Sequence, residues 1–77
     1  MTSYHDRITS DHRVMLGKPV IKNTRLTVAL LLRKLAEGAS SADLLVMYPY
    51  LEAADIQAVL EYAAAMVAYE AIIDSAA

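Results

Sequence analysis

Apolar residues recur with a helical period along the chain from residue 28 onward. Residues 27–37 contain the first such pattern, with apolar side chains at positions i, i+3, i+4 and i+7, namely Val28, Leu31, Leu32 and Leu35. The hydroxyl of Thr27 can cap a helix here, and Gly38 can adopt the left-handed conformation that ends one. We therefore predict a helix over residues 27–37.

Two further helices are predicted by the same period together with their end signals. Ser40 is suited to cap a helix over residues 41–48, because Asp43 stands three residues further on, close to a capping box. Pro49 ends this helix, since proline disfavours the α conformation in the residue before it. The longest helix is predicted over residues 53–73.

The predicted helix over residues 53–73 carries two apolar stripes. We assign one stripe to the core, formed by Ile56, Val59, Leu60, Ala63 and Val67. The second has no obvious partner within so short a chain and is formed by Tyr62, Met66, Tyr69 and Ile73. A surplus apolar stripe on a small protein indicates a partner or dimer interface, although it can also overhang a loose core or cover the N-terminal arm.

Residues 7–26 precede the helices and are predicted to form a β-hairpin arm. Two short apolar runs, residues 14–16 and 20–22, flank the turn signals of Gly17 and Pro19. Asn23 is suited to a further left-handed turn. Because an isolated hairpin is marginal in water and its edges can pair with another chain, we also expect a homodimer.

The length of 77 residues indicates a single domain, residues 1–77, that is marginally stable alone. The chain has no cysteine, no charged-then-apolar leader and no apolar run of the roughly 20 residues needed to cross a membrane. We therefore expect a cytoplasmic protein that does not interact with membranes and relies on an oligomer or a partner.

The net charge of −2 conceals a strong asymmetry along the chain. Residues 1–34 have seven basic and two acidic side chains, a net charge of +5 with neutral histidines, whereas residues 35–77 have seven acidic and no basic ones. Such asymmetry indicates either a face for nucleic acid or an acidic partner, or ion pairs between the two halves of one small fold.

The sequence contains no pattern typical of a catalytic site or of a cofactor-binding site, so we expect neither an enzyme nor a cofactor. The two histidines, His5 and His12, lie near the N-terminus without the spacing of a recognised metal site, and Gly17-Lys18 lacks the further glycines of a phosphate loop. Three helices joined by short turns are compatible with a helix-turn-helix, yet the third helix has no basic residue. Contact with DNA or with an acidic partner is therefore predicted for Arg7, Arg13, Lys18, Lys22, Arg25, Arg33 and Lys34.

Several stretches resemble the bacterial domain of unknown function 433 family, a group similar to VapB-type antitoxins. The resemblance covers about residues 7–68. The residues that carry it are Arg7-Ile8-Thr9-Ser10-Asp11, Gly17 to Val28 (GKPVIKNTRLTV), Leu35 to Ser40 (LAEGAS) and Tyr48 to Ala63 (YPYLEAADIQAVLEYA). The family pattern usually has glycine where this chain has Asn23, and often proline where it has His12; we expect Asn23 to preserve the turn.

The resemblance implies a mainly α, homeodomain-like three-helix bundle with an N-terminal β arm. It also implies a neighbouring gene for a toxin with a PIN-like nuclease fold, which the protein binds and restrains, together with binding to its own promoter. Arg25, at the start of the first helix, is expected to pair with Asp55 or another acid of the third helix, or else to bind an anion. We expect Gly17, Pro19, Asn23, Gly38 and Pro49 to shape turns.

We therefore expect an antitoxin-like protein that neutralises a PIN-like nuclease toxin, with promoter autoregulation. The alternative is a stand-alone dimeric DNA-binding regulator that uses the basic arm, and a dimeric scaffold without a nucleic-acid role is a third interpretation.

Overall fold

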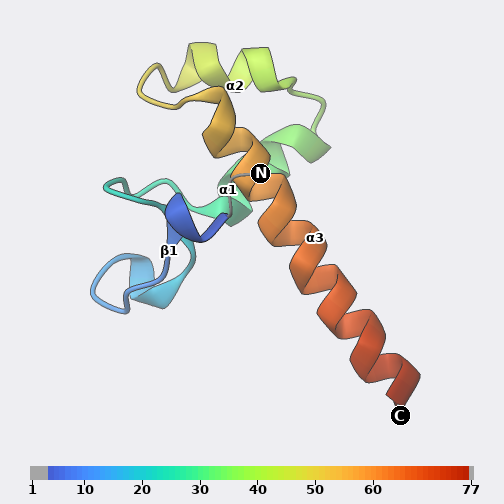
Figure 1. Cartoon of the computed structure of the whole chain (residues 1–77). Coiled ribbons are helices and arrows are strands. Elements are labelled where there is room, and N and C mark those ends of the chain that lie inside the picture. The colour runs from blue at the N-terminus through green and yellow to red at the C-terminus, as the bar shows by residue number, and fades with distance from the viewer. Residues whose placement is uncertain (1–3, 77) are drawn as a thin grey trace.

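The computed structural model describes residues 4–76, with side chains for Tyr4 and for residues 6–69. Three α-helices follow a short N-terminal arm (Figure 1). The arm comprises the 3-10 turn η1 (Tyr4–Asp6), strand β1 (Ile8–Thr9), the turn η2 (Met15–Gly17) and strand β2 (Val20–Ile21). The helices are α1 (Val28–Ala36), α2 (Ser41–Met47) and α3 (Ala53–Ala76). The predicted class, a helical bundle with a β-hairpin arm, is confirmed.

The predicted end signals of α1 and α2 are confirmed. The Thr27 hydroxyl accepts the backbone N–H of Leu30 at 3.1 Å. Ser40 and Asp43 exchange both bonds of a capping box, at 3.0 and 2.9 Å. At the other end of α1, Gly38 has a φ of +109°, and the N–H of Ala39 donates to the carbonyl of Lys34. The chain therefore leaves α1 through a Schellman-type turn, which needs a residue tolerant of positive φ.

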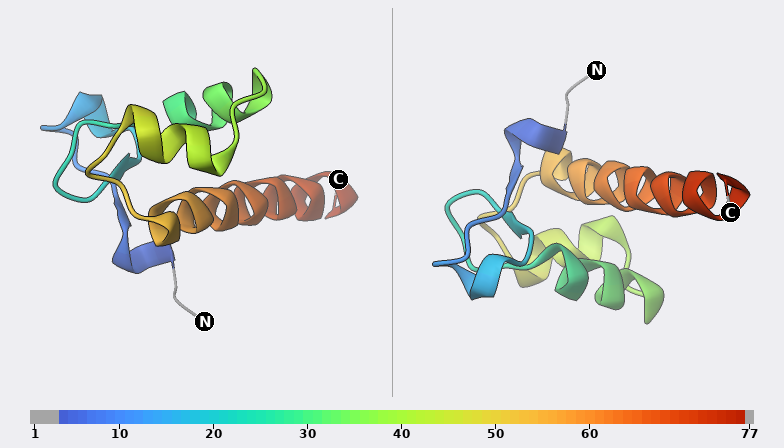
Figure 2. Two further views of the ribbon diagram at one scale, coloured as in Figure 1. Left: turned by 90° about the horizontal axis from the view of Figure 1, so that it is seen from above. Right: turned by 90° about the horizontal axis from the view of Figure 1, so that it is seen from below.

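The core lies where the three helices meet the arm. Leu31 of α1, Leu44 of α2 and Val59 of α3 are fully buried there. Ile8 and Ile21, one from each strand, are buried in the same cluster. Figure 2 shows α1 and α2 on one side of α3 and η1 on the opposite side. The first half of α3 is therefore covered from two sides.

The arm is a hairpin, but of the two apolar runs predicted around its turn only residues 20–22 contain a strand. β1 and β2 pair antiparallel, with Ile8 opposite Ile21 and Thr9 opposite Val20. The apolar run at residues 14–16 is not a strand, because η2 has positive φ at Met15 (51°), Leu16 (57°) and Gly17 (84°). The two paired segments are joined by the intervening loop rather than by a tight Gly-Lys-Pro turn. Burial explains why the segment around Ile8, and not the one around Leu16, pairs with β2. The side chain of Ile8 is buried in the core, whereas that of Leu16 is 90% exposed.

The predicted core stripe of the third helix is wrong at two of its five positions. Ile56 and Val59 are buried and Ala63 is half-buried, but Leu60 is 44% and Val67 is 65% exposed. The buried face instead continues from Val59 to the half-buried Tyr62, the first residue of the stripe assigned to a partner. Because α3 is apolar on all sides, helical period alone did not identify the face that the rest of the protein covers.

Candidate functional site

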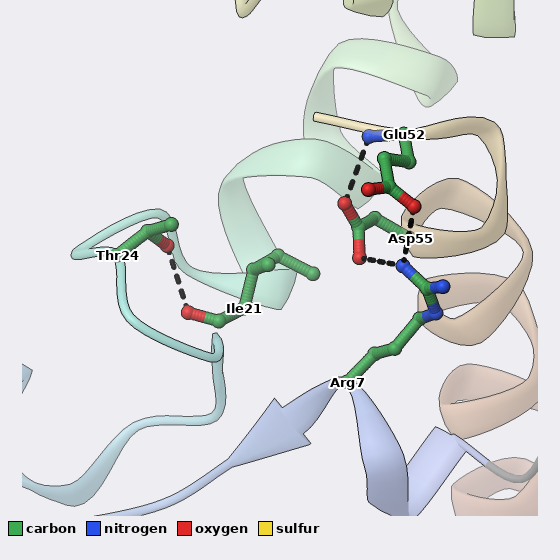
Figure 3. Close-up of polar contacts among 5 residues, drawn as sticks. All are labelled: Arg7, Ile21, Thr24, Glu52 and Asp55. Carbon is green, nitrogen blue, oxygen red and sulfur yellow. Dashed lines mark hydrogen bonds and ion pairs between the residues drawn. The ribbon is translucent and has the colours of Figure 1, made fainter. Parts of the chain in front are cut away.

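A partly buried ion-pair cluster joins the arm to the start of α3 (Figure 3). One guanidinium nitrogen of Arg7, NH1, lies 2.9 Å from Oδ1 of Asp55 and 3.2 Å from Oε2 of Glu52. The other carboxylate oxygen of Asp55, Oδ2, accepts the backbone N–H of Glu52 at 2.8 Å. Asp55 is the one charged residue that is buried within the described part of the chain. The cluster therefore caps α3 and fastens the arm to it.

The electrostatics of this cluster follow from its hydrogen bonds. The hydrogen bond to Asp55 raises the pKa of Arg7 above its ordinary value, and Glu52 adds to that rise. Arg7 therefore stays charged beside the two carboxylates. The negative charge of Asp55 also lies at a helix N-terminus, where the helix dipole stabilises it. Pairing between the two oppositely charged halves of the sequence is thus observed at Arg7.

Arg25 does not take the partner that the sequence predicted for it. Asp55 pairs with Arg7 instead, and Arg25 is exposed without an ion pair to any other described side chain. The loop between β2 and α1 explains its position. Thr24 donates its hydroxyl to the carbonyl of Ile21 at 2.8 Å and accepts the N–H of Leu26 at 3.0 Å. This tight loop directs the chain at Arg25 away from α3.

A cleft of about 470 Å³ lies between this loop and the start of α3. Its walls include the Arg7 cluster on one side and Lys22 and Asn23 on the other, with Tyr50 from the α2–α3 connection. Each carboxylate oxygen of Asp55 accepts a hydrogen bond from a protein group, one from Arg7 and one from the backbone of Glu52. Among the side chains that the structure describes, no three metal-ligating acids or histidines come together.

The seven basic residues do not form one continuous set of free cations. Arg7 is tied to α3, and Arg13 forms two bonds to Asp11 at 3.0 and 3.2 Å, which lower the pKa of that carboxyl. Lys18 and Lys22 are exposed on the arm, as is Arg25 in the loop that precedes α1. Arg33 and Lys34 lie in the last turn of α1, where a cation is favourable beside the helix C-terminus.

The stripe assigned to a partner is only partly free. Tyr62 packs edge-to-face on Tyr4 of η1, with ring centroids 5.4 Å apart, so the arm covers it. Met66 is exposed and Tyr69 is 62% exposed, on the part of α3 that extends beyond the other elements (Figure 1). The side chain of Ile73 lies outside the described residues. A stripe predicted as one surface is therefore divided between the arm and solvent.

Comparison with known proteins agrees with these local features. One family model, described as "Protein of unknown function (DUF433)", matches residues 8–63. The chain belongs to the DUF433 family. No curated protein and no solved structure matches it. No helix among the described residues is long and apolar enough to cross a membrane.

The part of the chain matched by the DUF433 model contains the turns that the sequence predicted. Gly17 and Asn23 have φ values of +84° and +64°, so asparagine does adopt the left-handed conformation where the family usually has glycine. The carbonyl of Pro19 accepts the N–H of Val28, which ties the arm to the start of α1. Pro49 follows immediately after the residue that caps the end of α2.

The sequence patterns did not predict that three apolar residues are exposed. Leu60 and Val67 were assigned to the core, and Leu16 to a strand of the hairpin. The glycine at position 17 indicated a turn but did not show that Leu16 belongs to the turn rather than to a strand before it. The distal part of α3, from residue 64, lies beyond the DUF433 match.

Proposed function

We propose that this DUF433 protein is a non-enzymatic, cytoplasmic protein-binding module of the antitoxin type, which binds and neutralises a nuclease with a PIN-like fold. The observation that carries the proposal is the exposed distal half of α3. Met66 and Tyr69, three residues apart and so on one face of the helix, lie there with large apolar side chains in contact with solvent. Exposed apolar surface of this kind is typical of interfaces, and tyrosine is enriched among the residues that dominate binding energy.

The charge of the arm supports the same proposal. A PIN-like nuclease has an active site rich in carboxylates, so a basic surface complements it. Lys18, Lys22 and Arg25 are exposed and have no ion pair within the described residues. Electrostatic complementarity of this type accelerates association and selects the partner more than it adds affinity.

The same cations support a second candidate function, a dimeric DNA-binding regulator, including autoregulation of its own promoter. Phosphate contacts need lysine or arginine, and α3 has neither, so the arm is the region suited to DNA. This function predicts that the logarithm of the binding constant falls steeply with the logarithm of salt concentration. Each phosphate-contacting residue removed should lower that slope by about 0.9.

The test is co-expression with the product of the adjacent gene, followed by light scattering of the purified material. A stable complex larger than either chain is the expected result. A homodimer that does not bind the neighbouring product would overturn the antitoxin proposal and direct the work to promoter DNA.

Two tyrosines with equal exposure provide a matched pair for locating the interface. Tyr69 is 62% exposed on distal α3, and Tyr50 is 61% exposed beside the Arg7 cluster. We expect Tyr69→Ala to weaken the complex at least tenfold, about 1.4 kcal/mol or more, as for an interface hot spot. Tyr50→Ala should leave affinity unchanged, and the reverse order would place the partner on the cleft instead.

A further inference from the structure

We propose that two copies of this chain associate reciprocally, with the tip of the arm of each copy docked on α3 of the other. The tip consists of Met15 and Leu16 in η2. The docking site is the face of α3 that carries Leu60 and Val67. This inference concerns self-association and stands independently of the partner proposed above.

The tip presents apolar side chains on a turn that backbone hydrogen bonds hold in place. Leu16 is almost fully exposed and Met15 is partly exposed, although both are large apolar residues. Backbone bonds hold the turn, from the N–H of Gly17 to the carbonyl of Val14 at 3.1 Å and from the N–H of Lys18 to the carbonyl of Met15 at 3.2 Å. A turn that holds non-glycine residues at positive φ and directs their side chains into water is arranged to contact something outside its own chain.

The docking face of α3 has the complementary shape. Leu60 and Val67 are seven residues apart, so they lie on the same side of the helix, two turns from each other. Ala64 lies between them and is exposed. A small residue between two larger apolar ones leaves a shallow depression, which suits a protruding leucine.

Charge distinguishes this arrangement from the other two ways of pairing these surfaces. Lys18 is exposed next to the tip, whereas the charge of Arg13 is offset by its bonds to Asp11. Of the acids in α3, Asp55 is already paired with Arg7, whereas Glu61 is next to Leu60, beside the docking face. Pairing α3 with α3 would bring two Glu61 side chains together, and pairing tip with tip would bring two Lys18 side chains together. Only tip against α3 opposes unlike charges.

The geometry of the protomer also favours reciprocal docking over pairing at strand edges. The arm and the distal half of α3 diverge from the core, so each copy offers both surfaces at once (Figure 1). In a dimer with a twofold axis the contact would form twice, as in other isologous dimers. By contrast β1 and β2 are two residues long, and Val20 of β2 is already bridged on its other side by Thr27. The hairpin edges therefore have little capacity to bind a second chain.

The chain has no cysteine, which allows the contact to be tested by disulfide trapping between single-cysteine variants. Leu16→Cys and Val67→Cys are purified separately, mixed and oxidised. We expect the 16–67 heterodisulfide to form faster than either homodisulfide. Val46→Cys, which is as exposed as these positions but lies on α2, is the matched control and should not link to position 16.

Two results would overturn the proposal. One is a dominant 67–67 disulfide, which would mean that α3 pairs with α3. The other is a monomer by light scattering at the concentration used for trapping.

Two substitutions test the contact without cysteines. Leu16→Asn introduces a residue that tolerates positive φ, so it should abolish self-association without lowering the melting temperature of the monomer. Lys18→Glu should weaken self-association about two- to fivefold, within the range of an exposed ion pair, whereas Lys22→Glu should not. Equal effects of the two lysine substitutions would show that only net charge matters and would contradict docking by the tip.

Discussion

The two halves of α3 have similar sequences and opposite environments. Residues 53–59 are held by α1, α2, η1 and the Arg7 cluster, and they include the buried Asp55, Ile56 and Val59. Residues 60–69 are even richer in apolar side chains, nine of ten against five of seven, yet Leu60 and Val67 face solvent. The difference arises because the other elements are too short to follow the 24-residue helix to its end. A helix can thus be structural at one end and available for binding at the other.

We expect the largest difference in stability between substitutions of one valine in each half of α3. Val59→Ala should lower the free energy of unfolding by about 2–3 kcal/mol, because it removes buried methyl groups and leaves a cavity. Val67→Ala removes the same atoms from an exposed site, where the better helix propensity of alanine compensates, so its effect should stay within about 0.5 kcal/mol. Urea unfolding of both variants, at a concentration where the chain is monomeric, measures the difference, and equal losses would mean that distal α3 is covered by its own chain.

The second prediction removes the anchor that distinguishes the first half of α3. Asp55→Ala should lower the free energy of unfolding by about 2 kcal/mol, because the N–H of Glu52 loses its acceptor and Arg7 loses its closest counter-charge. Glu61→Ala in the same helix is the control, with an expected change within about 0.5 kcal/mol. If thermal unfolding shows the same small shift for both variants, the cluster is not what fastens the arm.

Low pH should distinguish the exposed cap of α2 from the rest of the fold. The backbone N–H of Ser40 donates to the Asp43 carboxylate and holds the pKa of Asp43 below its ordinary value of 3.8. A carboxyl with a lowered folded-state pKa stabilises the fold above pH 3.8, and this contribution is lost as the pH falls through the lower folded-state value. Asp43→Asn should therefore lose less stability than the natural chain when unfolding is followed from pH 5 to pH 2.

Asp11 provides the check on this interpretation. Its pKa is lowered in the same direction by its hydrogen bonds with Arg13, so Asp11→Asn should remove a further part of the acid dependence. If neither variant alters the pH profile, these two carboxyls are not bonded in solution.

The smallest effect concerns the strained tip of the arm. Leu16→Asn should raise the free energy of unfolding of the monomer by about 0.5 kcal/mol, because asparagine tolerates the left-handed conformation better than leucine. Val46→Asn is the control: position 46 is also exposed but lies within α2, where valine and asparagine have similar helix propensities, so stability should not rise. A loss of stability with Leu16→Asn would mean that the exposed leucine has a partner within its own chain.

Local signals predicted most of the fold. Caps at Thr27 and Ser40, the left-handed stop at Gly38 and the turn at Asn23 depend on residues within a few positions, and the structure confirms each of them. Interactions at long range were less predictable. Arg7 and Asp55 are 48 positions apart, and the sequence analysis assigned the same acid to Arg25.

The sequence by itself determined where helices start and stop, because capping, glycine and proline act through neighbouring backbone atoms. It also determined that the C-terminal half is acidic and the N-terminal half basic. Only the tertiary structure decided which apolar residues are buried. In α3 all faces are apolar, and in the arm Ile8 and Leu16 are comparable in hydrophobicity, so burial depended on which of them lay within reach of Leu31, Leu44 and Val59.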